Sequence, residues 1–174
     1  MAFEEQLRSF IQKQCGDALV REETFRGDLS FFVTPEALPD LCQALYDETD
    51  LDVRFLKDIT SVDWYGHPDE VSKGRFEVVY NLYSLRHKAR FFVKVRLPEE
   101  KPEVASLTPL FGAANWLERE VWDLMGIVFT GHPDLTKILT PDDLEGHPLR
   151  RDYPLTYEQP RFSWNRDDPP EVIK

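Results

Sequence analysis

The chain has 174 residues, of which 41% are hydrophobic and 13% aromatic, a composition typical of one globular domain with room for an appendage. Its formal net charge of −11 argues against a nucleic-acid-binding protein, because phosphate binding relies on clustered lysine and arginine. No apolar run is long enough to span a membrane. The two cysteines, Cys15 and Cys42, lie far apart, and the first ten residues do not resemble a secretory leader. We therefore expect reduced thiols in a cytosolic compartment.

Hydrophobic spacing predicts a helix, a strand and a second helix in the first third of the chain. Apolar residues at helical spacing indicate the first helix over 3–11, and alternation indicates a strand over 29–33. The second helix, with one apolar face, is predicted over 38–45. Thr34 and the proline after it suit the start of this helix, unless Pro39 delays that start.

Three stretches of period two follow, over 53–59, 76–82 and 91–97. The short, mostly polar link at 84–88 predicts that the last two stretches pair as a hairpin. Alternation gives each strand one buried face, so helices should cover a single side of the sheet. The predicted fold class is α+β, a two-layer domain with helices on one face of a mainly antiparallel or mixed sheet.

The clearest helical pattern runs from Thr108 to Gly126. Thr108 is a good N-cap, Pro109 suits the first helical position, and Gly126 can end the helix in the left-handed conformation. The apolar residues 127–129 then predict a short extended piece.

Periodicity stops after this point, although apolar residues persist. Residues 131–174 hold seven of the 13 prolines, each of which removes a backbone donor. The apolar residues scattered through this stretch are Leu135, Ile138, Leu139, Leu144, Leu149, Tyr153, Leu155, Tyr157, Phe162 and Trp164. We therefore divide the chain into an α+β core domain, 1–129, and an extended proline-rich arm, 130–174. The apolar residues of the arm are expected to be buried against the core or, in large part, against a partner.

Motifs for binding a cofactor are absent from the sequence. There is no Gly-x-Gly, no phosphate-binding loop ending in Gly-Lys-Ser or Gly-Lys-Thr, and no Cys-x-x-Cys for an iron–sulfur cluster. Two Gly-His-Pro units place His132 and His147 near several aspartates, among them Asp134 and Asp152. Two imidazoles and a carboxylate are one way to hold a metal, but Gly-His-Pro is also an ordinary turn unit, which we favour.

The predicted helix also carries charges at Glu118, Arg119 and Asp123, and the helical spacing allows Arg119 to pair with Asp123. One interpretation is a solvated helix face. The other is that these charges hold the arm, with Arg150, Arg151 and Asp152 as their mates. A pair of carboxylates acting as an acid–base catalyst is disfavoured, because nothing nearby supplies a substrate pocket.

The residues around this helix closely resemble a known family. The run from Glu118 to Leu135, which contains Val121-Trp122-Asp123-Leu124-Met125-Gly126, is similar to the signature of the C-type subunit (NuoC, the 30-kDa type) of respiratory complex I. The similarity continues through 137–143 and 146–155, and 58–64 also resembles the family. It weakens before Val53 and after Leu155. Thr136 stands where the signature usually has proline or a basic residue, which puts one electrostatic contact of the arm in doubt.

The resemblance implies a non-redox, peripheral-arm subunit of the proton-translocating NADH-quinone oxidoreductase, with no active site of its own. FMN and iron–sulfur clusters are then expected in partner subunits and no cofactor in this chain. The implied partners are the large quinone-site subunit (D type), the terminal iron–sulfur subunit (B type) and the ferredoxin-like iron–sulfur subunit (I type). The implied location is the cytoplasmic face of the inner membrane.

A set of residues is predicted to anchor the arm or to contact a partner: Glu118, Arg119, Asp123, His132, Asp134, Lys137, His147, Arg150, Arg151, Asp152 and Tyr153. Two alternatives stay open. The first is the equivalent subunit of a membrane-bound hydrogenase or of another donor–quinone oxidoreductase. The second is a free-standing metal-dependent enzyme that uses His132, His147 and nearby aspartates.

Overall fold

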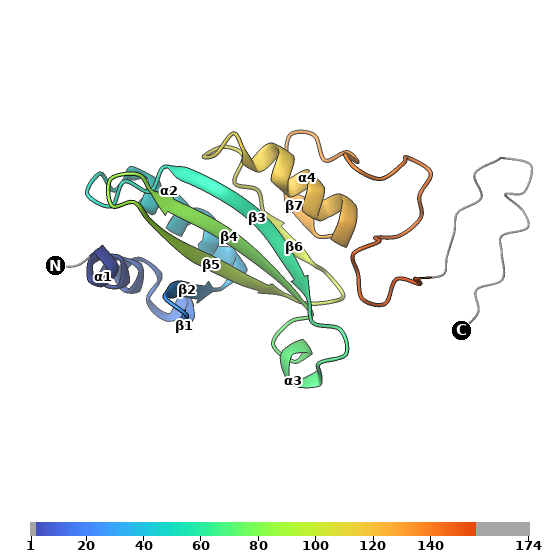
Figure 1. The fold of residues 1–174 in the computed structure, drawn as a ribbon, viewed down its shortest axis with the longest axis horizontal. Coiled ribbons are helices and arrows are strands. Elements are labelled where there is room, and N and C mark those ends of the chain that lie inside the picture. The colour runs from blue at the N-terminus through green and yellow to red at the C-terminus, as the bar shows by residue number, and fades with distance from the viewer. Residues whose placement is uncertain (1–2, 156–174) are drawn as a thin grey trace, which may run out of the picture.

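The computed structural model describes residues 3–155 and confirms the predicted α+β fold class. Its elements are α1 (Phe3–Cys15), a 3-10 turn (Gly16–Ala18), β1 (Leu19–Phe25), β2 (Asp28–Val33), a second 3-10 turn (Pro35–Ala37), α2 (Leu38–Asp47), β3 (Phe55–Asp63), α3 (Pro68–Val71), β4 (Phe76–Ser84), β5 (Ala89–Leu97), β6 (Glu103–Ala105), α4 (Ala114–Met125) and β7 (Val128–Thr130). The five-stranded sheet has the order β1-β2-β5-β4-β3 (Figure 1). Its strand pairs are antiparallel except β2 with β5, and the short strands β6 and β7 form a separate parallel pair.

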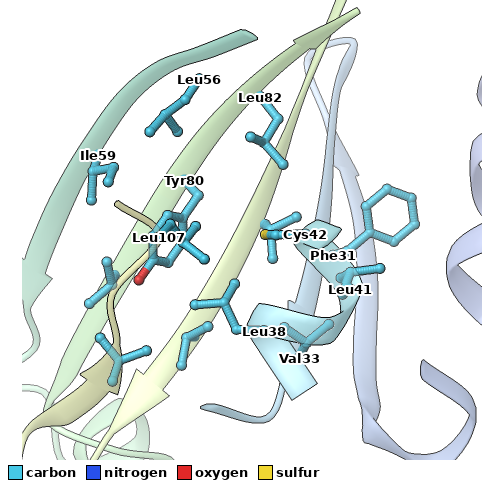
Figure 2. Packing of buried hydrophobic residues seen from close by; sticks show 14 of the residues in the cluster. Phe31, Val33, Leu38, Leu41, Cys42, Leu56, Ile59, Tyr80, Leu82 and Leu107 are labelled. Atoms are coloured by element: carbon cyan, nitrogen blue, oxygen red, sulfur yellow. The ribbon is translucent and has the colours of Figure 1, made fainter. Parts of the chain in front are cut away.

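One continuous core fills the space between the sheet and the helices α1, α2 and α4. Every second residue is buried on this side from Phe76 along β4 and from Phe91 along β5, as the period of two predicted. Figure 2 shows Leu38, Leu41 and Cys42 of α2 among the strand side chains Tyr80 and Leu82. α4 lies along β3 (Figure 1). Within residues 3–155, no helix is long and apolar enough to cross a membrane.

Strand β1 is the main element that the sequence pattern did not reveal. Six of its seven residues are exposed, so they carry no hydrophobic alternation. The strand forms because its backbone pairs with β2 at one edge of the sheet. The start of α2 also differs from the simplest prediction: Thr34 makes no side-chain cap, and the helix begins at Leu38 with Pro39 in its first turn.

The predicted start of the last helix at Thr108 is wrong, because α4 begins at Ala114. The N–H groups of Leu110 and Phe111 both bond to the carbonyl of Leu107, which closes a separate turn before the helix. The Thr108 hydroxyl forms a hydrogen bond with the Ser106 hydroxyl and does not cap α4. The predicted end is confirmed, since the Gly126 backbone is left-handed, with φ 72° and ψ 24°.

The arm was defined from the sequence as residues 130–174, of which the structure describes 130–155. After β7 ends at Thr130, this part contains only turns and extended backbone. Leu135 is partly buried and packs against the core, whereas Leu155 is fully exposed. The apolar residues Tyr157, Phe162 and Trp164 lie outside the described residues.

Candidate functional site

Residues of the arm form hydrogen bonds with the carboxyl end of helix α4. A helix leaves its last carbonyl groups without intrahelical partners, and these attract donors and positive charge. Gly126 turns the chain away and donates its own N–H to the carbonyl of Trp122 (2.8 Å). The arm supplies donors to the next three carbonyls: His147 Nδ1 to Asp123 (3.0 Å), Leu149 N–H to Leu124 (3.0 Å) and Arg150 Nε to Met125 (2.7 Å). Burial lowers the pKa of Arg150, and the nearby charge of Arg75 lowers it further.

Asp123 holds a second point of the arm with its side chain. The N–H groups of Ile138, Leu139 and Thr140 all point to Asp123 Oδ2, at 3.0, 2.8 and 3.0 Å, and the Thr140 hydroxyl donates to Oδ1. Asp123 is only 2% exposed. Burial alone would raise the pKa of this carboxyl, but the hydrogen bonds from Thr140, Leu139 and Ile138 outweigh it and lower the pKa to about 2. Asp123 is therefore an ionised anchor for the arm backbone.

Arg119 holds the arm just before that point. Its Nε donates to the Thr136 carbonyl (3.1 Å), and its Nη2 donates to the Thr136 hydroxyl (2.9 Å) and the Lys137 carbonyl (3.2 Å). The predicted pairing of Arg119 with Asp123 is thus replaced by contacts from each side chain to the arm. Thr136, the departure from the family signature, supplies one of these contacts. The Lys137 ammonium in turn donates to the carbonyls of Pro141 (3.0 Å), Asp142 (3.3 Å) and Leu144 (2.7 Å).

We expect Arg119→Ala to loosen the arm at Lys137. The substitution removes three hydrogen bonds, but the contact is exposed, so we expect a cost of about 1 kcal/mol. That energy corresponds to about fivefold faster tryptic cleavage after Lys137, where opening and closing are faster than cleavage. The measurement is the rate of that cleavage in the full chain. Arg54→Ala, which removes another partly exposed arginine, is the control and should leave the rate unchanged.

Glu118 fits neither interpretation proposed for the helix charges. It is fully buried, and it accepts hydrogen bonds from the Ser106 hydroxyl (2.6 Å) and the Leu107 N–H (2.7 Å), in the link before α4. Burial raises the pKa of this carboxyl, and the hydrogen bonds from Ser106 and Leu107 oppose the rise. Glu118 therefore fixes the link between β6 and α4, not the arm.

His132 and Asp134 form a turn at the start of the arm. His132 Nδ1 accepts the N–H of Asp134 (3.0 Å), and Nε2 faces the carbonyl of Asn115 on α4 (3.1 Å). These partners assign the ring proton to Nε2. His132 and His147 thus bond to different carbonyls of the same helix, 3.1 and 3.0 Å away. Within residues 3–155, no three side chains of histidine, cysteine, aspartate or glutamate gather in a way that could hold a metal.

A buried ion pair between Asp63, the last residue of β3, and Arg75, which precedes β4, holds the third point of the arm. Sequence reasoning missed this pair. Arg75 and Asp63 form two parallel hydrogen bonds, Nε to Oδ1 (3.0 Å) and Nη2 to Oδ2 (2.9 Å), and their side chains are 2% and 1% exposed. Arg75 Nη2 also reaches Asp152 (2.7 Å), and the Arg151 N–H donates to Asp63 Oδ2 (2.9 Å). Glu99 is the third carboxylate paired with Arg75, with its Oε1 2.6 Å from Arg75 Nη1.

The charges in this cluster stabilise one another. Burial alone would raise the pKa of Asp63, but hydrogen bonds from Arg75, Arg151 and Tyr65 lower it to about 2. The pKa of Asp152 is also lowered, chiefly by its hydrogen bond with Arg75. The prediction that Arg150, Arg151 and Asp152 meet the side-chain charges of α4 is therefore corrected. Arg151 and Asp152 join Asp63 and Arg75, while Arg150 bonds to the helix end.

No pattern in the sequence marks Asp63 and Arg75 as partners. Asp63 ends β3 and Arg75 precedes β4, positions where a charged residue is ordinary, and the two strands are separate stretches of chain. The run 58–64 did belong to the family resemblance, which is the one signal that includes Asp63. Tyr153 closes this part of the arm, with its hydroxyl 3.4 Å from the Glu145 carbonyl and its ring against Gly146.

The arm is thus held at three places: by the side chains of Arg119 and Asp123, by the end of α4, and by the Asp63–Arg75 pair. These three sets of contacts are called the clamp below. We expect Gly126→Ala to disturb it, because an added Cβ would collide with His147 and Arg150 and the backbone is left-handed. The expected loss is about 2–3 kcal/mol of unfolding free energy, of which about 1 kcal/mol is backbone strain. Urea unfolding measures the total. Gly131→Ala is the matched control, since Gly131 also has a positive φ but open space around it. Equal losses in the two variants would contradict contact with the arm.

Several apolar side chains of the clamped region face away from the core. Leu139 and Leu149 are 63% and 60% exposed, although the backbone beside each is bonded to α4. Trp116 on α4 is 61% exposed, with the Arg119 guanidinium 5.1 Å from its ring. Isolated exposed apolar residues are common, but a set along one fixed segment is typical of a surface that another protein covers.

Known proteins resemble this chain over most of its length. The model of the family described as respiratory-chain NADH dehydrogenase, 30 Kd subunit, matches residues 31–159. The C-type subunit of NADH-quinone oxidoreductase from Roseiflexus sp. strain RS-1 is 46% identical over 151 residues, which cover 87% of this chain and 84% of that protein. NADH-quinone oxidoreductase subunit 5 of Thermus thermophilus is 58% identical over 106 residues, 58% of this chain and 51% of that protein.

Two solved structures share the fold. A trypsin-resistant fragment of Nqo5 superposes with a TM-score of 0.63 and 37% identity, covering 78% of this chain and all of the fragment. A chain of the membrane-bound sulfane sulfur reductase, an archaeal respiratory membrane complex, has a TM-score of 0.71 and covers 88% of this chain and 86% of its own. Its 24% identity shows the shared fold alone.

The fold and the clamp define a class of protein, an α+β domain in which the last helix and a buried ion pair at the end of the edge strand β3 fix a proline-rich segment to the surface. The family match begins within β2 and continues through the described arm. The chain belongs to the family of the 30 Kd subunit of respiratory-chain NADH dehydrogenase, whose bacterial members compared above are the C-type subunit and subunit 5 of NADH-quinone oxidoreductase.

Proposed function

We propose that this chain is a non-redox, peripheral-arm subunit of a proton-translocating NADH-quinone oxidoreductase that supports assembly of the quinone-reducing module. In this proposal electrons pass from NADH through FMN and iron–sulfur clusters held by other subunits to quinone. The chain itself has no active site and binds no cofactor. The partners are the large quinone-site subunit (D type) and the iron–sulfur subunits of the B and I types, at the cytoplasmic face of the inner membrane.

The observation that carries this proposal is the orientation of the arm. Its backbone is bonded to α4 and to the Asp63–Arg75 pair, whereas Leu139 and Leu149 expose most of their surface. Ordering an extended segment costs about 1–2 kcal/mol per residue of backbone entropy, so a segment fixed in this way needs a compensating gain. Burial of the exposed leucines against a partner would supply part of that gain.

The experiment is purification of the tagged chain from its native membranes in a gentle detergent, followed by mass spectrometry of the proteins recovered with it. We expect quinone-site and iron–sulfur subunits together with NADH-oxidising partners. A chain truncated after Phe129 should keep a folded core, judged by circular dichroism, and lose those partners. Normal incorporation of the truncated chain would refute the role of the arm in assembly.

A second candidate is the equivalent subunit of another respiratory membrane complex. It is favoured by the fold shared with a chain of the sulfane sulfur reductase complex. The same purification separates the two, because recovery of nickel-hydrogenase subunits or of another donor module would replace the NADH-oxidising partners. Recovery of the chain alone, with a stoichiometric metal and an activity lost in His132→Ala, would instead favour the free-standing metal-dependent enzyme.

A further inference from the structure

A groove of about 460 Å³ lies where β1 and β2 meet the segment that follows α3 and the end of β5. Residues of both chemical kinds line it, including Val20, Phe32 and Pro35 with apolar surface and Arg21, Lys73 and Arg96 with cationic heads. None of these residues takes part in the clamp. The groove is therefore a second candidate site, separate from the contacts that hold the arm.

An irregularity in strand pairing shapes one wall of the groove. β1 pairs Leu19 with Val33 and Arg21 with Phe32, so Val20 is an extra residue on the β1 side. Such a bulge re-aims the side chain at the sheet edge, and Val20 is 68% exposed as a result. A large apolar side chain on an edge strand is unusual, because edges are commonly protected by charge.

Phe32 lines the groove, and two cations lie near its ring. It is 6% exposed, with the Arg21 guanidinium 3.9 Å and the Lys94 ammonium 5.1 Å from its ring centre. Each lining cation has a carboxylate partner outside the lining: Arg21 pairs with Glu23 (3.3 Å), and Lys73 pairs with Glu70 (2.8 Å). Arg96 pairs with Glu70 (2.6 Å) and Glu77 (2.8 Å).

The charged residues that line the groove are all cationic, whereas the chain as a whole is acidic. Three cations and no carboxylate belong to its described lining, in a chain with 32 acidic and 21 basic residues. The side chains of Arg21 and Lys73 remain 47% and 53% exposed, so an incoming carboxylate can reach them by exchanging with Glu23 and Glu70. Surface ion pairs of this kind are worth under about 1 kcal/mol. An apolar floor with a cationic rim fits a peptide that carries an apolar side chain beside acidic ones.

We propose that this groove binds an extended acidic segment of a second protein, with one apolar side chain against Val20 and Phe32 and carboxylates at Arg21 and Lys73. This contact is independent of the arm and gives the chain a second protein-binding surface.

The test is photo-crosslinking of the full chain in whole cells, with photoreactive p-benzoylphenylalanine in place of Val20. We expect an adduct with another protein, mapped by mass spectrometry to an acidic segment. Arg21→Glu combined with Lys73→Glu should reduce the adduct about tenfold, since reversal of two charges at a rim converts attraction into repulsion. Both side chains are exposed, and thermal unfolding of the purified variants checks that the fold is kept.

Two controls make the outcome specific. Arg86→Glu with Lys101→Glu changes the charge equally at exposed positions outside the groove and should leave the adduct unchanged. The photoreactive residue at Leu85, which is 55% exposed in the turn between β4 and β5, should not give the same adduct. An adduct with lipid alone, an adduct within this chain, no adduct above the Leu85 level, or insensitivity to charge reversal would each overturn the proposal.

Discussion

Replacing Arg75 with alanine is expected to lower the free energy of unfolding by about 3–5 kcal/mol, the largest effect of any single change in the clamp. Asp63 is buried in the fold and accepts two hydrogen bonds from Arg75. Without the guanidinium, the carboxylate would stay buried with only backbone donors or would have to take up a proton. The same change releases Asp152, so the arm should lose its hold on the sheet.

Urea unfolding at neutral pH measures this loss, and two variants show where it comes from. Arg90→Ala breaks another two-bond pair, with Asp28, but these side chains are 49% and 35% exposed, so a loss of under about 1 kcal/mol is expected. Asp152→Ala removes the arm contact while the buried pair stays intact, and a similarly small loss is expected. If Arg75→Ala cost no more than Arg90→Ala, the buried pair would not stabilise the fold.

The elements that the sequence predicted well are those with a buried face. β4 and β5 alternate between buried and half-exposed residues along most of their length, and the polar link between them left a hairpin as the simplest connection. The end of α4 was equally clear, because a glycine after an apolar helix pattern suits a left-handed backbone. In each case the local pattern and the tertiary contact favour the same structure.

The elements that were missed or misplaced depend on contacts that no local pattern contains. β1 is exposed, so only its pairing with β2 reveals it. Thr108 and Pro109 form a good local helix start, yet the buried carboxylate of Glu118 binds the preceding Leu107 N–H and the chain enters the helix later. A capping preference is worth about 1 kcal/mol, which tertiary contacts readily exceed.

The helix charges show the same limit. Spacing alone placed Arg119 next to Asp123, and a pair of this kind is worth only a few tenths of a kcal/mol. The proline-rich arm presents backbone N–H groups that no helix or sheet uses, and three of them converge on Asp123. A charge-assisted hydrogen bond is worth about 1.5–3 kcal/mol, so the arm displaces the local pair. The family resemblance indicated these residues, whereas their partners required the structure.

Asp123→Asn is expected to lower the free energy of unfolding by about 2 kcal/mol at pH 7, because the folded protein holds the pKa of this buried carboxyl at about 2. The asparagine keeps one oxygen, but its NH₂ group would face donors of the arm. The loss should fall on the attachment of 138–140, so we also expect faster hydrogen exchange at these three amides.

The pH dependence gives this prediction its sharpest form. The folded pKa is depressed, so the stabilisation by Asp123 is fully present above the unfolded value of about 3.9 and is lost as the pH falls towards about 2. The difference in unfolding free energy between the original chain and Asp123→Asn should therefore be constant from pH 7 to about pH 5 and shrink below about pH 4. Asp63 titrates in the same range, but it is present in both proteins and cancels in the difference.

Asp134→Asn, the same substitution at an exposed arm residue, should show no such difference at any pH. If the difference in unfolding free energy between the original chain and Asp123→Asn persisted unchanged to about pH 2.5, the charge of Asp123 would not be what holds the arm.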